Sequence, residues 1–188
     1  MQVKRRMPIY YLSLCALFAA LSAVLSQIAI PIGPVPINMV HVSVFCAAGL
    51  LGAKYGTLSQ VVFVIMGTVG IPVFAQFNAG LWRITAGYII GNVFCTLVAA
   101  LIIDKFGRSV KVLVSAMCAG FVMTYLFGIT WVVFWTNHLS PYPPEVPLTA
   151  AAAIISILLF LPGDALKVIM SVVLIRRLHP VMQRRVHR

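Results

Sequence analysis

The chain has 188 residues, of which 62% are hydrophobic and only 9% are charged, and its formal net charge is +11. This composition excludes an ordinary soluble domain and predicts one all-α membrane domain over residues 1–188, without a second domain. The basic residues cluster at the termini and in short connections, as is typical where membrane helices emerge in the cytoplasm. We therefore expect residues 1–8 and the basic tail 179–188 to be cytoplasmic, and no nucleic acid as a partner.

Six apolar segments are predicted to form membrane helices, because backbone that faces lipid must be hydrogen-bonded internally. They span residues 9–30, 38–53, 57–70, 84–103, 111–136 and 149–178. The first is longer than the apolar core of a secretory signal, so we expect it to be retained. The second and third are shorter than the roughly 20 residues that span a bilayer comfortably. Pro162-Gly163 interrupts the sixth, which predicts an outer half helix at 148–160 and a second helix that ends near Arg176-Arg177.

The distribution of cations predicts the orientation of this bundle. If both termini are cytoplasmic, all of the 14 lysines and arginines except Arg83 and Lys167 lie on the inner side. Such a bias predicts six spans with N-in and C-in topology. The four cysteines are far apart in apolar segments, without metal-ligand spacing. We expect no metal, no cofactor and no disulfide framework.

Two of the unusual charges stand together in the sixth segment. Asp164 and Lys167 follow Pro162-Gly163, and the chain has only three acidic residues. Their three-residue spacing places both on one helix face, and the proline places them near a helix start. Because a charge at the bilayer centre costs roughly 2.5–3.5 kcal/mol, this pair indicates a binding site. The alternative is an ion pair that only lowers their joint cost of insertion.

Further polar and aromatic residues are predicted at the same depth, in the outer loop before the fourth segment and at its start. Asn78 and Arg83 provide an amide and a second cation, and the aromatic candidates are Phe74, Phe77, Trp82 and Tyr88. The set suits a small ligand with a carboxylate, an apolar middle and an amide-like end. The alternatives are a snorkelling Arg83, an Asn78 that caps its loop and aromatic interface anchors. We expect His41 to be a satisfied buried or interfacial histidine.

The first segment carries two overlapping pairs of small residues, Ala16 with Ala20 and Ala19 with Ala23. This spacing permits close approach of another helix in lipid. Contact within the bundle and contact with a partner helix are both compatible with it.

Several blocks of sequence resemble the BioY family. They are Ala-Leu-Phe-Ala-Ala-Leu at 16–21, Ile-Pro-Ile-Gly-Pro-Val-Pro-Ile at 30–37, Gly-Leu-Leu-Gly-Ala-Lys-Tyr-Gly at 49–56, Gly-Ile-Pro-Val-Phe-Ala at 70–75, Ala-Gly-Tyr-Ile-Ile-Gly at 86–91 and Leu-Pro-Gly-Asp-Ala-Leu-Lys at 161–167. The resemblance implies a six-helix S component of an energy-coupling factor (ECF) transporter that binds biotin from outside. It also implies that Asp164 and Lys167 contact the vitamin, with Asn78 and Arg83 as the nearest matches to two further contacts. The chain departs from the family pattern at 83–88, where a longer Gly-Pro-Thr-Gly-Gly-Tyr-type stretch is usual.

The resemblance further implies that the small-residue face of the first helix docks a membrane-embedded coupling subunit driven by paired ATPases. No nucleophile–base pair, metal cluster or Walker motif is present in the sequence, so we expect a carrier and not an enzyme. The predicted function is biotin uptake in the cell membrane, in which Lys167 and Arg83 hold one polar end of the ligand and Asp164 and Asn78 the other. The alternatives are an S component or solitary carrier for another small vitamin, and a helical adaptor without a ligand.

Overall fold

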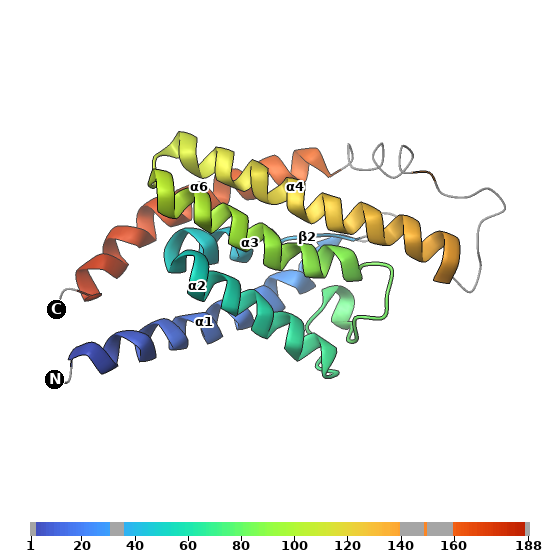
Figure 1. Ribbon diagram of the computed structural model, residues 1–188, viewed down its shortest axis with the longest axis horizontal. Coiled ribbons are helices and arrows are strands. Elements are labelled where there is room, and N and C mark those ends of the chain that lie inside the picture. The colour runs from blue at the N-terminus through green and yellow to red at the C-terminus, as the bar shows by residue number, and fades with distance from the viewer. Residues whose placement is uncertain (1–2, 31–35, 140–148, 150–159, 187–188) are drawn as a thin grey trace.

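The computed structural model describes residues 3–30, 36–139, 149 and 160–186, and the expected half helix at 148–160 lies almost wholly outside these ranges. The described elements, in chain order, are α1 (Val3–Gln27), β1 (Ala29–Ile30), β2 (Ile37–Asn38), α2 (Val40–Thr68), a 3₁₀ turn (Ala75–Phe77), α3 (Ala86–Phe106), α4 (Val110–Phe134), a π-helical turn (Trp135–Leu139) and α6 (Leu161–Val186). Figure 1 shows that these helices form an elongated bundle with both termini at one end.

Two predicted helix ends are wrong. The first helix was expected to reach residue 30, but α1 ends at Gln27 and Ala29–Ile30 pairs with Ile37–Asn38 as an antiparallel ribbon. The β-branched Ile28 and Ile30 favour extended backbone at this point. The last helix was expected to end near Arg176-Arg177, but α6 continues through Pro180 to Val186, because most of the following residues are good helix formers.

The second and third predicted segments, 38–53 and 57–70, fall together within α2, which turns sharply at Gly52. Gly52 has φ +72°, a left-handed conformation that glycine adopts without steric cost. The two halves lie side by side, since a Cβ at Gly56 would come within 2.7 Å of the Ala47 carbonyl oxygen. The two predicted helices therefore exist as the two halves of α2.

Polar contacts fix this turn at both helix ends. The backbone N–H of Ala53 donates to Asp104 Oδ2 at 3.0 Å, and Arg108 Nε donates to the Gly49 carbonyl oxygen at 2.9 Å. Side chains of α3 and of the α3–α4 connection thereby satisfy backbone groups that a helix break leaves unpaired. The turn is thus tied to the same end of the bundle as both termini (Figure 1).

Helices α3 and α4 form an antiparallel hairpin with close backbone contact. Gly107 ends α3 with φ +88°, and the Ser109 hydroxyl caps α4 by accepting from the Val112 N–H at 3.4 Å. Gly91 of α3 packs directly on Thr124 of α4, where a Cβ would come within 2.9 Å of the Thr124 Cα. Such small residues allow tight packing between helices in lipid.

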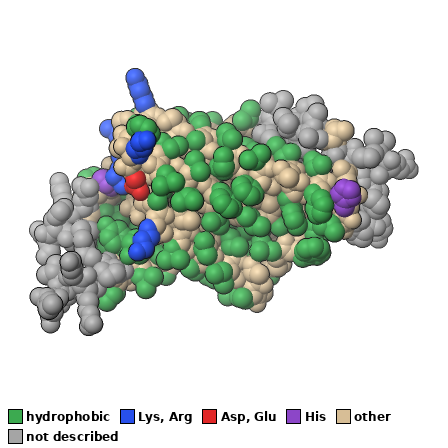
Figure 2. Space-filling model, viewed as in Figure 1, with side chains coloured by type: hydrophobic (Ala, Val, Ile, Leu, Met, Phe, Trp, Pro, Cys, Tyr) green, Lys and Arg blue, Asp and Glu red, His purple; other side chains and the backbone are tan. Residues whose placement is uncertain are grey.

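The surface agrees with a multi-pass membrane protein. By length and composition, four of the described helical stretches can cross a membrane, namely Ile9–Gln27, Val40–Thr68, Ala86–Phe106 and Val110–Leu139. Figure 2 shows a flank covered mainly by hydrophobic side chains, with lysines and arginines gathered at the end where the termini lie. The exposed cations there include Lys54, Lys105 and Lys111.

Candidate functional site

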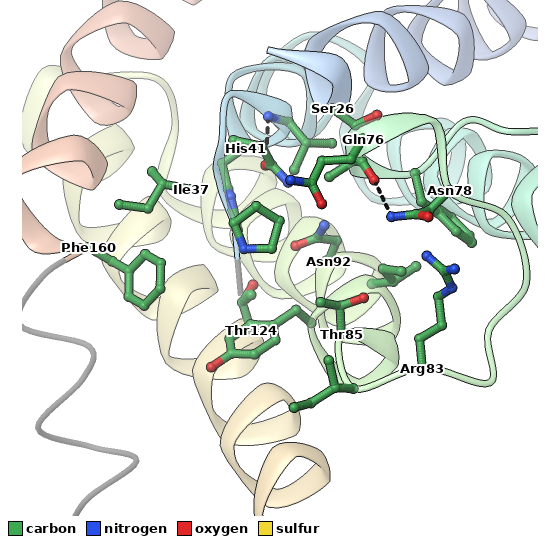
Figure 3. A pocket seen from close by; sticks show the side chains of 18 of the residues that line it. Ser26, Ile37, His41, Gln76, Asn78, Arg83, Thr85, Asn92, Thr124 and Phe160 are labelled. Carbon is green, nitrogen blue, oxygen red and sulfur yellow. Dashed lines mark hydrogen bonds between the residues drawn. The ribbon is translucent and has the colours of Figure 1, made fainter. Parts of the chain in front are cut away.

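A cavity of about 480 Å³ lies between the helices, within the size range of small-ligand sites. Every described α-helix contributes to its lining, together with the loop that joins α2 to α3 (Figure 3). Residues that represent each helix are Ser26 of α1, His41 of α2, Asn92 of α3, Tyr125 of α4 and Lys167 of α6. The cavity thus depends on the whole bundle and not on one hairpin.

The structure brings Asp164 and Lys167 together at the wall of this cavity. Lys167 Nζ lies 2.8 Å from Asp164 Oδ1, and the residues are only 3% and 6% exposed. Asp164 lies in the first turn of α6, as predicted, and its backbone N–H donates to the Phe160 carbonyl oxygen at 2.9 Å. The two charges therefore neutralise each other in a buried site that borders an open space.

Tyr125 of α4 is a third member of this group. Its hydroxyl donates to Asp164 Oδ2, so both carboxylate oxygens have a partner. Tyr125 could not be chosen from sequence, because a tyrosine in an apolar helix carries no signal of the direction in which its side chain points. Its contact with Asp164 links α4 to α6 and fixes the carboxylate plane at the cavity wall.

The loop between α2 and α3 places Phe74 and Asn78 on another wall. These two residues form an antiparallel bridge, and the Asn78 amide donates to the Ala75 carbonyl oxygen at 2.9 Å. Gln27 of α1 secures the loop, since its amide nitrogen lies 3.1 Å from the carbonyl oxygens of Val73 and Phe74. Asn78 therefore lines the cavity and also holds its own loop, as the alternative interpretation expected.

Arg83 and Tyr88 also line the cavity, as predicted. Arg83 is half-buried, and among the described residues no carboxylate pairs with its guanidinium. Phe160 lies directly before α6. Figure 3 shows Arg83 and Asn78 on the opposite side of the cavity from Phe160. The Tyr88 ring rests on Gly128, where a Cβ would overlap it.

The other two aromatic candidates differ from each other. Phe77 is 74% exposed and does not line the cavity, so its prediction as a wall residue is wrong. The positive φ values of Gln76 and Phe77, 62° and 55°, turn the chain so that this ring points away. Trp82 does line the cavity, although it is 71% exposed, and its ring packs edge-on against Trp135 at 5.6 Å.

His41 and Asn92 are cavity residues that the sequence did not assign to the site. His41 was expected to be hydrogen-bonded or interfacial, yet within the described ranges neither of its buried ring nitrogens has a hydrogen-bond partner. Asn92 is 4% exposed, and its buried side-chain oxygen likewise has no partner there. Both residues lie in apolar helices, where only the three-dimensional packing shows which face meets the cavity.

The small residues of α1 divide between two faces. Ala19 is 1% exposed and Ala23 packs with it in a cluster that includes Phe63 of α2. Ala16 and Ala20 are exposed, on a face that also presents Leu12, Leu17, Leu21 and Val24. One pair therefore serves packing within the bundle, and the other lies on the outer surface.

Comparisons with known proteins agree over nearly the whole chain. A model of the BioY family matches residues 1–184. A protein of Pyrococcus horikoshii named "Probable biotin transporter BioY" is 36% identical over 88% of this chain and 94% of its own length. The "Biotin transporter BioY" of Lactococcus lactis is 35% identical over 79% of each chain. The crystal structure of an S-component for biotin from an ECF-type ABC transporter is similar with TM-score 0.82 and 28% identity, over 92% of each chain.

Proposed function

Because this chain belongs to the BioY family, we propose that it binds biotin and carries it across the membrane as the S component of an ECF-type transporter. The observation that carries the proposal is the buried Asp164–Lys167 pair at the wall of a ligand-sized cavity. The alternative function, a helical adaptor that binds no ligand, offers no reason to bury these two charges, whose insertion into a membrane is unfavourable. The family consists of transporter components and not of enzymes.

The two ends of biotin fit different sides of the cavity. Biotin has a carboxylate at the end of an apolar chain and a neutral ureido group on its ring system. Arg83 is a cation that has no carboxylate partner among the described residues, so it suits the ligand carboxylate. Asp164 already neutralises Lys167, so this side suits the ureido group, whose N–H donates to Asp164 and whose oxygen accepts from Lys167.

Aromatic and amide groups complete the proposed site. Phe74 and Tyr88 border the space between the two polar sides, and we assign them to the apolar part of the ligand. Asn78 donates one N–H of its amide to the Ala75 carbonyl oxygen, so the second N–H and the amide oxygen remain for the ligand. These roles differ from the prediction from sequence, which placed Lys167 with Arg83 at one polar end of the ligand and Asp164 with Asn78 at the other. The reason for the change is that Lys167 pairs with Asp164.

The proposal retains a bundle of six spans with both termini in the cytoplasm. Six described segments support this arrangement, namely α1, the two halves of α2, α3, α4 and α6. Both chain ends also lie at the end of the bundle where the lysines and arginines gather (Figures 1 and 2). The positive-inside rule places that end in the cytoplasm. The loop that carries Asn78 and Arg83 then faces the outside, from which biotin enters.

We further propose that α1 docks the coupling subunit through its exposed face. Ala16 and Ala20 lie on this face and permit close approach of a partner helix, whereas Ala19 and Ala23 are used within the bundle. The chain contains no Walker motif, so ATP hydrolysis belongs to the paired ATPases of the module. Lipid covers the remaining apolar flank.

The test is equilibrium binding to the purified full chain in detergent, with biotin in competition against other small vitamins. We expect saturable biotin binding that the other vitamins do not displace. Asp164→Asn and Lys167→Met should each weaken it at least about 100-fold, because each leaves an unpaired charge or an unpaired ligand group. Lys111→Met, an exposed control at the opposite end, should bind as the wild type does. Displacement by another vitamin at equal concentration contradicts the biotin assignment.

A further inference from the structure

Three neutral side chains that line the cavity, those of His41, Asn92 and Thr124, have a buried polar atom without a hydrogen-bond partner among the described residues. Both ring nitrogens of His41 and the side-chain oxygen of Asn92 are buried, and no hydrogen bond reaches them from the described residues. Buried polar atoms in folded proteins are nearly always hydrogen-bonded, and an unpaired one is unfavourable. Because these atoms belong to residues that line one cavity, a ligand is the natural partner for them.

The packing of His41 fixes the direction of its ring. The imidazole lies 4.9 Å from the Phe121 ring and 6.0 Å from the Phe45 ring, measured between centroids. Phe45 is fully buried and Phe121 is 8% exposed, so these rings hold the imidazole in place. Figure 3 shows His41 and Asn92 projecting from different helices toward the interior of the cavity.

The chemistry of this pair differs from that of the charged residues. In either tautomer an imidazole has at least one N–H donor, and an amide oxygen is an acceptor. A donor and an acceptor without a fixed charge suit a planar neutral group that carries both a carbonyl oxygen and an N–H. A cyclic urea has this pattern, whereas a carboxylate has acceptors only and gains nothing from the amide oxygen of Asn92.

We propose that His41 and Asn92 form a neutral subsite that recognises the ureido group of the ligand. The His41 N–H donates to the ureido carbonyl oxygen, and Asn92 Oδ1 accepts from a ureido N–H. This inference rests on the proposed function and adds two specificity-determining residues to it. The Asp164–Lys167 pair meets the same group from α6, so the ureido oxygen accepts from both Lys167 and His41, and its two N–H groups donate to Asp164 and Asn92. Arg83 remains the partner of the carboxylate.

The test compares three ligands by calorimetric titration of the full chain in detergent. Biotin is the reference, biotin methyl ester lacks the carboxylate charge, and 2-iminobiotin replaces the ureido oxygen with a nitrogen. His41→Phe should weaken biotin and the methyl ester by the same factor, about 10- to 100-fold. At neutral pH the ring of 2-iminobiotin is a protonated guanidinium, whose nitrogens donate hydrogen bonds and do not accept them. His41→Phe should therefore weaken 2-iminobiotin less than about threefold, since the lost hydrogen bond has no acceptor in this ligand. His41→Gln, which keeps a donor, should recover part of the loss.

The second variant and the control use the same titrations. Asn92→Leu should weaken biotin and its methyl ester by about 10- to 100-fold, and Arg83→Gln should weaken biotin but not the ester. The matched control is Thr57→Val, because the Thr57 hydroxyl is also buried, finds no partner in the described part of the chain and does not line the cavity. Thermal unfolding of each variant verifies that it is folded.

Three results overturn the inference, and only the third of them also overturns the proposed function. If the wild type binds biotin and the His41 and Asn92 variants bind it equally well, the subsite is refuted while the function stands. If His41→Phe weakens biotin and 2-iminobiotin by equal factors, His41 does not contact the ureido oxygen. If the folded wild type does not bind biotin, the proposed function and this inference both fail.

Discussion

The buried ion pair of Asp164 and Lys167 should contribute to stability as a unit, so that replacing either residue alone destabilises the fold. With Lys167 replaced by Met, Asp164 is a carboxylate that is 6% exposed and keeps only the Tyr125 hydroxyl as a side-chain partner among the described residues. Removing one member of a buried ion pair costs about 3–5 kcal/mol, because the other charge stays buried without compensation. The pair borders a cavity, so we expect the lower end of this range, about 3 kcal/mol.

This loss has a measurable consequence for thermal unfolding. For a domain of this size, about 3 kcal/mol corresponds to a fall in Tm of roughly 6–12 °C. Asp164→Asn and Lys167→Met should each show such a fall in detergent without ligand. The double variant should lose no more than either single variant, because it buries no net charge. Lys111→Met, an exposed control, should keep the wild-type Tm.

Additive losses in the double variant, or single variants as stable as the wild type, would refute this account of the pair. Additive losses mean that the two charges act independently, in spite of their burial and mutual contact.

Three further predictions concern the turn, the cavity wall and the outer face of α1. Gly52→Ala should lower the free energy of unfolding by about 1–2 kcal/mol, because L-residues are strained at φ +72°; an unchanged Tm contradicts this. Gly67→Ala should cost about 1–3 kcal/mol and weaken biotin binding, since its Cβ overlaps the Phe74 ring; unchanged affinity argues against Phe74 as a wall. Ala20→Trp should leave biotin affinity unchanged and reduce uptake by cells that contain the coupling module, and normal uptake excludes this face as the docking surface.

The charged part of the site could be predicted from the sequence because charges are rare in this chain. Asp164 and Lys167 stand out in an apolar segment, and their spacing places them on one helix face. The Pro162-Gly163 signal likewise located the start of α6 to within a residue. Strong local signals therefore predicted that these two charges lie together, and the structure shows them as a buried ion pair.

The uncharged residues of the candidate site could not be predicted from the sequence, because their positions depend on packing between helices. Tyr125, Asn92 and His41 occur in apolar helices, and the sequence does not show which face of a helix meets the cavity. The direction of Phe77 depends on positive φ values at two residues that are not glycine, which sequence patterns rarely indicate. The sequence predicted that the last helix ends at the Arg176-Arg177 cluster. However, α6 continues beyond Arg177, because the helix propensity of the following residues favours continuation.

Two tryptophans at the cavity allow a direct test of biotin binding. Trp82 and Trp135 line the cavity and contact each other, so a ligand in it should change their fluorescence. Titration of the purified chain with biotin should give a saturable change with one site per chain. The same titration should give no saturable change with the folded Asp164→Asn/Lys167→Met double variant. An absence of biotin binding by the folded wild type, measured in parallel by calorimetry, would contradict the account.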